Sequence, residues 1–90
     1  MAKQTFLKDN NFHIEWEVVG DQCHVHCTVE GWSKSVALVG YLHFVKLRQF
    51  VKDMGHDCFY SITPNPQFCE FYGGQYIGEQ DGKEVMIWVT

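Results

Sequence analysis

The sequence predicts one α+β domain in which two helices pack on a mixed, mostly antiparallel sheet, in the order (β)-β-β-α-β-α-β-β. Two stretches that alternate strictly between apolar and polar residues predict a hairpin, and a helical apolar period predicts one long helix after it. The chain has 90 residues, of which 46% are hydrophobic and 16% aromatic. A chain of this length has room for one hydrophobic core, and its apolar content is too high for a disordered chain. We therefore expect residues 1–90 to form a single domain.

The hairpin is predicted over residues 12–19 and 22–29, which are joined by Gly20-Asp21, a pair suited to a two-residue turn. With that turn, Phe12 faces Val29 on an apolar side and Glu15 faces His26 on a charged side. This sorting into two faces is what a half-buried antiparallel pair requires. Residues 1–11 are interpreted as a weak first strand over residues 5–8 or as a frayed end.

The long helix is predicted from Ser33 or Ser35, either of which can serve as the N-cap, to Met54, with Gly55 as its left-handed C-terminal residue. Its apolar stripe is expected to face the sheet. The stripe consists of Leu38, Tyr41, Leu42 and Val45, followed by Leu47, Phe50, Val51 and Met54.

Further apolar residues, among them Val39 and Phe44, make the apolar arc of this helix wider than one sheet face would cover. A helix that is apolar on most sides is usually covered on most sides. We therefore expect a protein partner, or a second copy in a homodimer, to dock along residues 33–54.

A short apolar strand follows over residues 58–63, and the connection through the long helix predicts that it lies parallel to strand 22–29. Asn65 is a good N-cap and Pro66 a good first residue for a short second helix. Gly73-Gly74 would end that helix after about two turns.

The last two strands are predicted over residues 75–79 and 84–89, with a turn around Asp81-Gly82. A tight two-residue turn would place Glu79 opposite Glu84, and like charges directly opposite are destabilising. We therefore expect a longer loop.

Charge and composition exclude several functional classes. The net charge is −4 and the seven Lys and Arg residues are scattered singly, which argues against nucleic-acid binding and against an anionic membrane surface. The start, Met-Ala-Lys-Gln-Thr, has no apolar core of a secretory signal, and no stretch is apolar enough to span a bilayer. The four cysteines are interpreted as reduced thiols, and the expected location is the cytoplasm.

A local pattern follows strand 58–63: Asn65-Pro66-Gln67-Phe68-Cys69-Glu70-Phe71-Tyr72-Gly73-Gly74. It combines an Asn-initiated helix, an aromatic pair near its end and a glycine that leads into an antiparallel hairpin. Together with the element order over residues 12–89, this resembles the GNAT acyltransferase fold without its N-terminal helices. Short bacteriophage proteins, including some virion and early proteins, look similar.

The resemblance implies a minimal acetyl-CoA-dependent N-acetyltransferase. In the family, the tyrosine at the position of Tyr72 often protonates the departing thiolate of coenzyme A. The backbone amides of Ser33, Lys34 and Ser35 would hold a phosphate at the helix start, and Asn65 would fix the pantetheine arm.

The junction between strand 22–29 and the long helix departs from the family, because it lacks the basic-x-x-Gly-x-Gly pattern. Gly31 is its one glycine, Trp32 is bulky where backbone must approach a phosphate, and Glu30 is an anion beside an anion site. No cofactor is therefore expected. The preferred function is a non-catalytic interaction protein that modulates a host protein or defence complex, with an acetyltransferase or a structural virion component as alternatives.

Two groups of side chains have competing interpretations. Tyr72 is either the acid named above or a packing aromatic at a helix end with its hydroxyl in water. His13, His24 and His26 share one strand face and could bind zinc, but a solvated face paired with Glu15 and Glu17 is preferred. The aromatic residues Phe68, Phe71, Tyr72 and Tyr76 are expected in the core, with one or two at the edge of a pocket or an interface.

Overall fold

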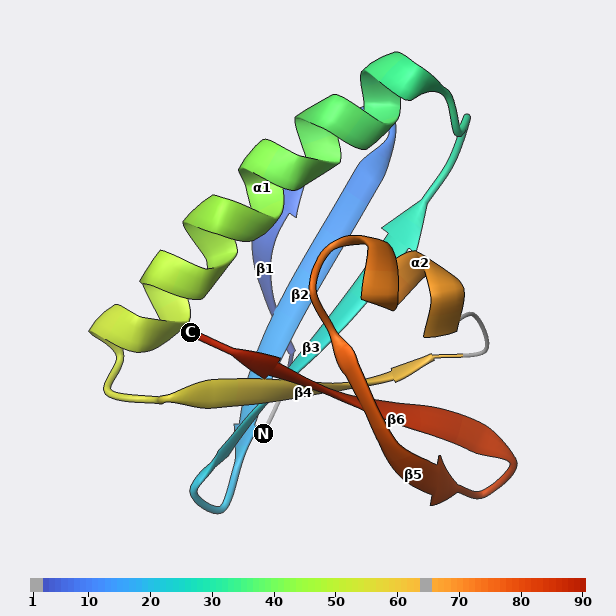
Figure 1. Cartoon of the computed structure of the whole chain (residues 1–90). Coiled ribbons are helices and arrows are strands. Elements are labelled where there is room, and N and C mark those ends of the chain that lie inside the picture. The colour runs from blue at the N-terminus through green and yellow to red at the C-terminus, as the bar shows by residue number, and fades with distance from the viewer. Residues whose placement is uncertain (1–2, 64–65) are drawn as a thin grey trace.

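The computed structural model describes residues 3–63 and 66–90, and it has the predicted order of elements. The strands form one six-stranded sheet in the order β1-β2-β3-β4-β6-β5 (Figure 1). Among the described strands β3 and β4 are the parallel pair, and the other neighbouring pairs are antiparallel. The α+β class with a mixed sheet is confirmed. The elements are β1 Gln4–Lys8, β2 Phe12–Val19, β3 Gln22–Val29, α1 Lys34–Asp53, β4 Cys58–Thr63, α2 Pro66–Phe71, β5 Gln75–Gln80 and β6 Lys83–Val89.

The first hairpin has the predicted register. Phe12 faces Val29 and Glu15 faces His26, with the turn at Gly20 and Asp21. Residues 4–8 form a strand and not a frayed end, because β1 pairs with β2 at the edge of the sheet. Its register shifts between Thr5 and Leu7, and such a bulge disfavours edge-to-edge pairing with another chain.

Helix α1 begins and ends where the capping residues predict. The hydroxyl of Ser33 accepts a hydrogen bond from the amide of Val36 at 3.2 Å, so Ser33 is the N-cap. At the other end Gly55 has a φ of +96°, and the amide of His56 donates back to the carbonyl of Val51 at 3.2 Å. This is a Schellman motif, which satisfies carbonyls that the helix leaves free.

Helix α2 ends in the same motif, at the predicted glycine pair. Gly73 has a φ of +101°, and the amide of Gly74 donates to the carbonyl of Cys69 at 2.8 Å. The guanidinium of Arg48, on α1, donates to the carbonyl of Tyr72 at 2.6 Å and so caps this helix end from outside. The predicted N-cap of α2, Asn65, lies outside the described residues.

The expected longer loop between β5 and β6 is wrong. The strands are joined by a two-residue turn in which Asp81 and Gly82 have φ values of +54° and +78°. Asp-Gly is a pair that favours such a turn, and the geometry of the turn sets the register between β5 and β6. Glu79 therefore does lie opposite Glu84, near the surface, where repulsion between like charges is worth only a few tenths of a kcal/mol.

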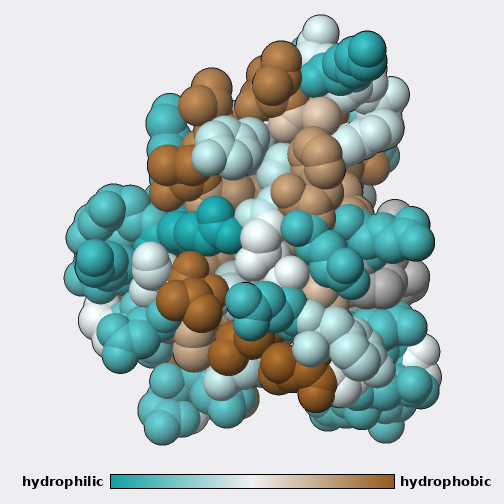
Figure 2. Space-filling model, viewed as in Figure 1, coloured by the Kyte–Doolittle hydropathy of each residue, from teal (hydrophilic) through white to brown (hydrophobic). Residues whose placement is uncertain are grey.

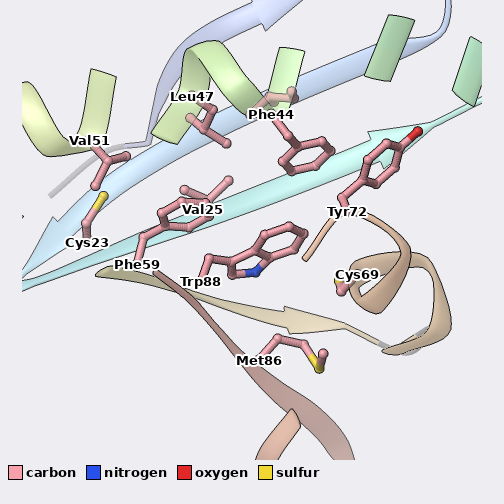
Figure 3. Close-up of a cluster of buried hydrophobic side chains, with 11 residues drawn as sticks. Cys23, Val25, Phe44, Leu47, Val51, Phe59, Cys69, Tyr72, Met86 and Trp88 are labelled. Carbon is pink, nitrogen blue, oxygen red and sulfur yellow. The ribbon is translucent and has the colours of Figure 1, made fainter. Parts of the chain in front are cut away.

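Both helices lie on the same face of the sheet and share one core (Figures 1 and 3). Its centre is a column of stacked rings from α1, β4, β6 and Tyr72, the residue that follows α2. Phe44 of α1 stacks on Tyr72 at 4.7 Å between ring centroids and on Trp88 at 5.0 Å, and Trp88 stacks on Phe59 at 5.5 Å. This column fixes α2 against α1 and both against β4 and β6.

Candidate functional site

Tyr72 lies inside the core, between the two helices. It is 3% exposed, and its hydroxyl donates a hydrogen bond to the carbonyl of Ala37 on α1 at 3.0 Å. The expectation that the hydroxyl lies in water is therefore wrong, whereas the packing role of the ring is confirmed. Burial raises the pKa of Tyr72, with a smaller contribution from Cys27. A buried phenol whose proton is directed at a backbone carbonyl is poorly placed to protonate a leaving group.

The residues predicted to hold a phosphate surround the start of α1. Ser33, Lys34 and Ser35 are all exposed, and the hydroxyl of Ser33 is directed inward to its own helix as the cap. Ser33 thus caps the first turn of α1, and this structural role requires no bound ligand. The fourth predicted residue, Asn65, lies outside the described residues.

The parallel strands β3 and β4 diverge. They share one pair of Cα partners, His24 and Tyr60, and beyond it the two strands separate (Figure 1). Side chains from α1, α2 and β6 fill the gap and leave a cavity of about 70 Å³. Sites for small organic ligands are typically about 300–1,000 Å³. This cavity is therefore too small for the pantetheine arm of acetyl-CoA, and we derive no step through that cofactor.

The three histidines of the outer strand face are each engaged in local contacts. His26 contacts the carboxylate of Glu17 at 3.2 Å, and His13 lies 3.9 Å from the carboxylate of Glu15. His24 contacts the side chain of Gln22 at 3.3 Å. Among the described residues no three His, Cys, Asp or Glu side chains are placed to hold a metal ion. The two histidine–glutamate contacts agree with the preferred interpretation, in which these histidines pair with Glu15 and Glu17 on the outer face of the hairpin.

The first half of the predicted core stripe on α1 is wrong, and its residues form the candidate site. The buried line of the helix is instead Gly40, Phe44, Leu47 and Val51. The second half of the stripe is confirmed: Leu47 and Val51 are buried, while Phe50 and Met54 pack against the core. The first half forms a strip on the outside of the helix, which we call the outward strip: Leu38, 72% exposed, Tyr41, 57%, Leu42, 60%, and Val45, 47%.

Gly40 explains the displacement of the buried line. A Cβ atom there would lie 2.6 Å from Cζ of Phe12 and 2.9 Å from Cζ of Tyr72, distances that packed atoms do not adopt. The absence of a side chain lets β2 and α2 approach the helix closely at this position. Glycine is not counted among the apolar residues when a helical period is sought. The period therefore omitted Gly40 and predicted that the outward strip would be the buried face.

A groove runs from the outward strip toward α2. It has a volume of about 480 Å³ and is lined by Lys34, Ala37, Leu38, Tyr41 and Phe71. Phe71 is 63% exposed. The ring of Trp32 packs edge-on against Phe71, with centroids 6.2 Å apart, and supports it from the loop before α1. Of the four aromatic residues expected in the core or at a pocket edge, Tyr72 is buried, Phe68 packs against the core, and Phe71 lies at the edge of this groove. Tyr76 is 53% exposed.

The outward strip and Phe71 together form an exposed apolar surface, and contiguous apolar surface often marks a site of interaction with another protein. Figure 2 shows hydrophobic residues gathered on the same face of the molecule, over the part of the view that α1 occupies. The sequence predicted that one or two of these four aromatic residues would border a pocket or an interface, but which of them do so depends on tertiary packing.

Positive charge borders this surface. Lys34 lies one turn before Leu38, Lys46 one turn after Leu42, and Lys52 two turns after Val45, which places all three lysines along the strip. Asp53 is the one acidic residue of α1, and it accepts a hydrogen bond from Gln49 at 2.8 Å. In the described part of the chain no lysine takes part in an ion pair.

Comparison with protein families, with curated proteins and with solved structures finds no match to this chain. Within residues 3–63 and 66–90, neither helix is both long and apolar enough to cross a bilayer.

Proposed function

We propose that the chain is a non-catalytic interaction module on a GNAT-like scaffold, and that it docks on another protein through the outward strip of α1. One observation carries the proposal. Leu38, Tyr41, Leu42 and Val45 have the spacing of a buried helix face, yet they lie on the solvent side of the helix. Covering each of these side chains would stabilise a complex by about 1 kcal/mol or more.

The groove between α1 and Phe71 supports this function, because tight interfaces place a large apolar side chain in a pocket at their centre. The resemblance to short phage proteins suggests the class of target, which is a host protein or a defence complex in the host cytoplasm.

A peptide-display selection tests the proposal and does not require an identified partner. A library of random helical peptides is selected on the wild-type chain and then assayed on Leu42→Asp. Val19→Asp is the matched control, because Val19 is a similarly exposed apolar residue at the end of β2. We expect selected peptides to bind wild type and the control and to lose at least tenfold in affinity for Leu42→Asp. Peptides that bind all three proteins equally would refute docking through the strip.

The second candidate function is the acetyltransferase, which rests on the resemblance of the element order and of residues 65–74 to the GNAT fold. Calorimetric titration with acetyl-CoA separates the two candidates. Micromolar binding, together with transferase activity that Tyr72→Phe abolishes, would support the enzyme. No binding up to millimolar ligand would exclude it.

A further inference from the structure

The charges around the outward strip differ in sign from those of the rest of the chain. Helix α1 holds four of the seven Lys and Arg residues but only one of the eleven Asp and Glu residues. Its charge is therefore +3, whereas the whole chain carries −4, so the remaining residues sum to −7. Arg48 donates to Tyr72 at the end of α2, so the positive charges near the strip are those of Lys34, Lys46 and Lys52, while the rest of the chain is net negative.

We propose that the partner segment is an acidic amphipathic helix, with an apolar stripe that covers the outward strip and carboxylates that pair with Lys34, Lys46 and Lys52. This inference rests on the proposed function. A helix is the element that presents apolar groups at the same spacing as Leu38, Tyr41, Leu42 and Val45, and helices commonly dock in this way. A large side chain of that helix would fill the groove beside Phe71.

Charge complementarity favours this occupant over a second copy of the chain. In a homodimer built on the strip, two α1 helices would face each other, each with a charge of +3 and with lysines as its principal charged groups. Like charges across an interface oppose association. Glu70, beside Phe71, is the acidic group at the α2 border, so the partner's carboxylates are expected over α1.

Two designed peptides test the inference on the full chain. They share one helical apolar stripe, and their flanking positions are glutamate in one and lysine in the other. We expect the acidic peptide to bind wild type at least tenfold more tightly than the basic peptide, with a preference that decreases at high salt. The double variant Lys46→Glu/Lys52→Glu should lose that preference. The control Lys8→Glu/Lys83→Glu, which changes the net charge equally at exposed sites away from the strip, should keep it.

The alternative outcomes separate this inference from the proposed function. If both peptides bind equally and Leu42→Asp weakens both, the acidic partner is wrong and docking through the strip stands. If neither binds, the acidic partner is wrong as well, and the display selection decides the proposed function independently. Two further results would overturn the inference: a dimer in light scattering that Leu42→Asp dissociates, or Leu42-dependent binding to vesicles of phosphatidylcholine and phosphatidylserine.

Discussion

Tyr72 packs directly on Gly40, so that the ring at the end of α2 occupies the space where a side chain on α1 would be. The tyrosine hydroxyl donates to the carbonyl of Ala37, one turn earlier on the same helix. Gly40 lies on the buried line of α1 together with Phe44, Leu47 and Val51, and the outward strip lies on the exposed side of the same helix.

Gly40→Ala should destabilise the fold although alanine is the better helix former. The intrinsic gain in helix propensity is about 1 kcal/mol, but the new methyl group would overlap Phe12 and Tyr72, and overpacking of a core costs about 1–3 kcal/mol. We expect a net fall in the free energy of unfolding of up to about 2 kcal/mol in urea denaturation. Ser35→Ala, at an exposed position of the same helix, is the control, and a more stable Gly40→Ala protein would contradict the packing described here.

Tyr72→Phe should lower the free energy of unfolding by about 0.5–1.5 kcal/mol, because it removes one buried hydrogen bond while keeping the stacked ring. Thermal and urea unfolding measure this loss. A variant as stable as wild type would show that the hydroxyl contributes nothing to the packing of α2 on α1.

Arg48→Met should destabilise the end of α2. Methionine keeps much of the apolar stem, but it cannot donate to the carbonyl of Tyr72 and cannot place a cation over the ring of Trp88, which now lies 5.7 Å from the guanidinium carbon. We expect a loss of about 1–3 kcal/mol and faster hydrogen exchange at the amides of Gly73 and Gly74. Unchanged exchange at these two amides would contradict the capping role.

Leu42→Ala and Leu47→Ala form a pair that tests which face of α1 is buried. Leu42 is 60% exposed and Leu47 is 0% exposed. We expect Leu42→Ala to change the free energy of unfolding by less than about 0.5 kcal/mol and Leu47→Ala to lower it by about 2–5 kcal/mol. Equal losses would mean that both sides of the helix are covered within the isolated chain.

Acid should weaken the link between the β1–β2 turn and α1. Hydrogen bonds from the amides of Phe12 and Asn11, and the contact with His43, hold the pKa of Asp9 below its ordinary value of 3.8. A lowered pKa in the folded state stabilises the protein above pH 3.8, and this contribution is lost as the pH falls through the folded-state pKa. The urea midpoint of wild type should therefore drop more between pH 6 and pH 2.5 than that of Asp9→Asn. Equal drops would show that Asp9 plays no part.

The first hairpin was predictable from the sequence because two alternating strands and a turn of fixed length admit one register that separates apolar from charged residues. The helix ends were predictable for a similar reason, since Ser33 and Gly55 each satisfy backbone groups through purely local geometry. In both cases the deciding interactions lie close together along the chain.

The buried face of α1 was not predictable in this way, because it depends on a contact between residues far apart in sequence. Nothing near Gly40 reveals that the ring of Tyr72 will pack there. The exposure of Phe71 likewise depends on how α2 is placed by the stacked rings. The residues of the candidate site have the helical spacing of a buried face, but tertiary packing leaves them on the surface. The local period therefore predicted the wrong face of α1 as buried.

The most direct test of docking through the outward strip is a chemical-shift map of the isotope-labelled chain on titration with a peptide selected by display. We predict that the largest shifts fall on the amides of residues 34–46 and on Phe71, and that the titration shows no such shifts with Leu42→Asp. Shifts concentrated on the open face of the sheet, or around the cavity between β3 and β4, would contradict docking through the strip.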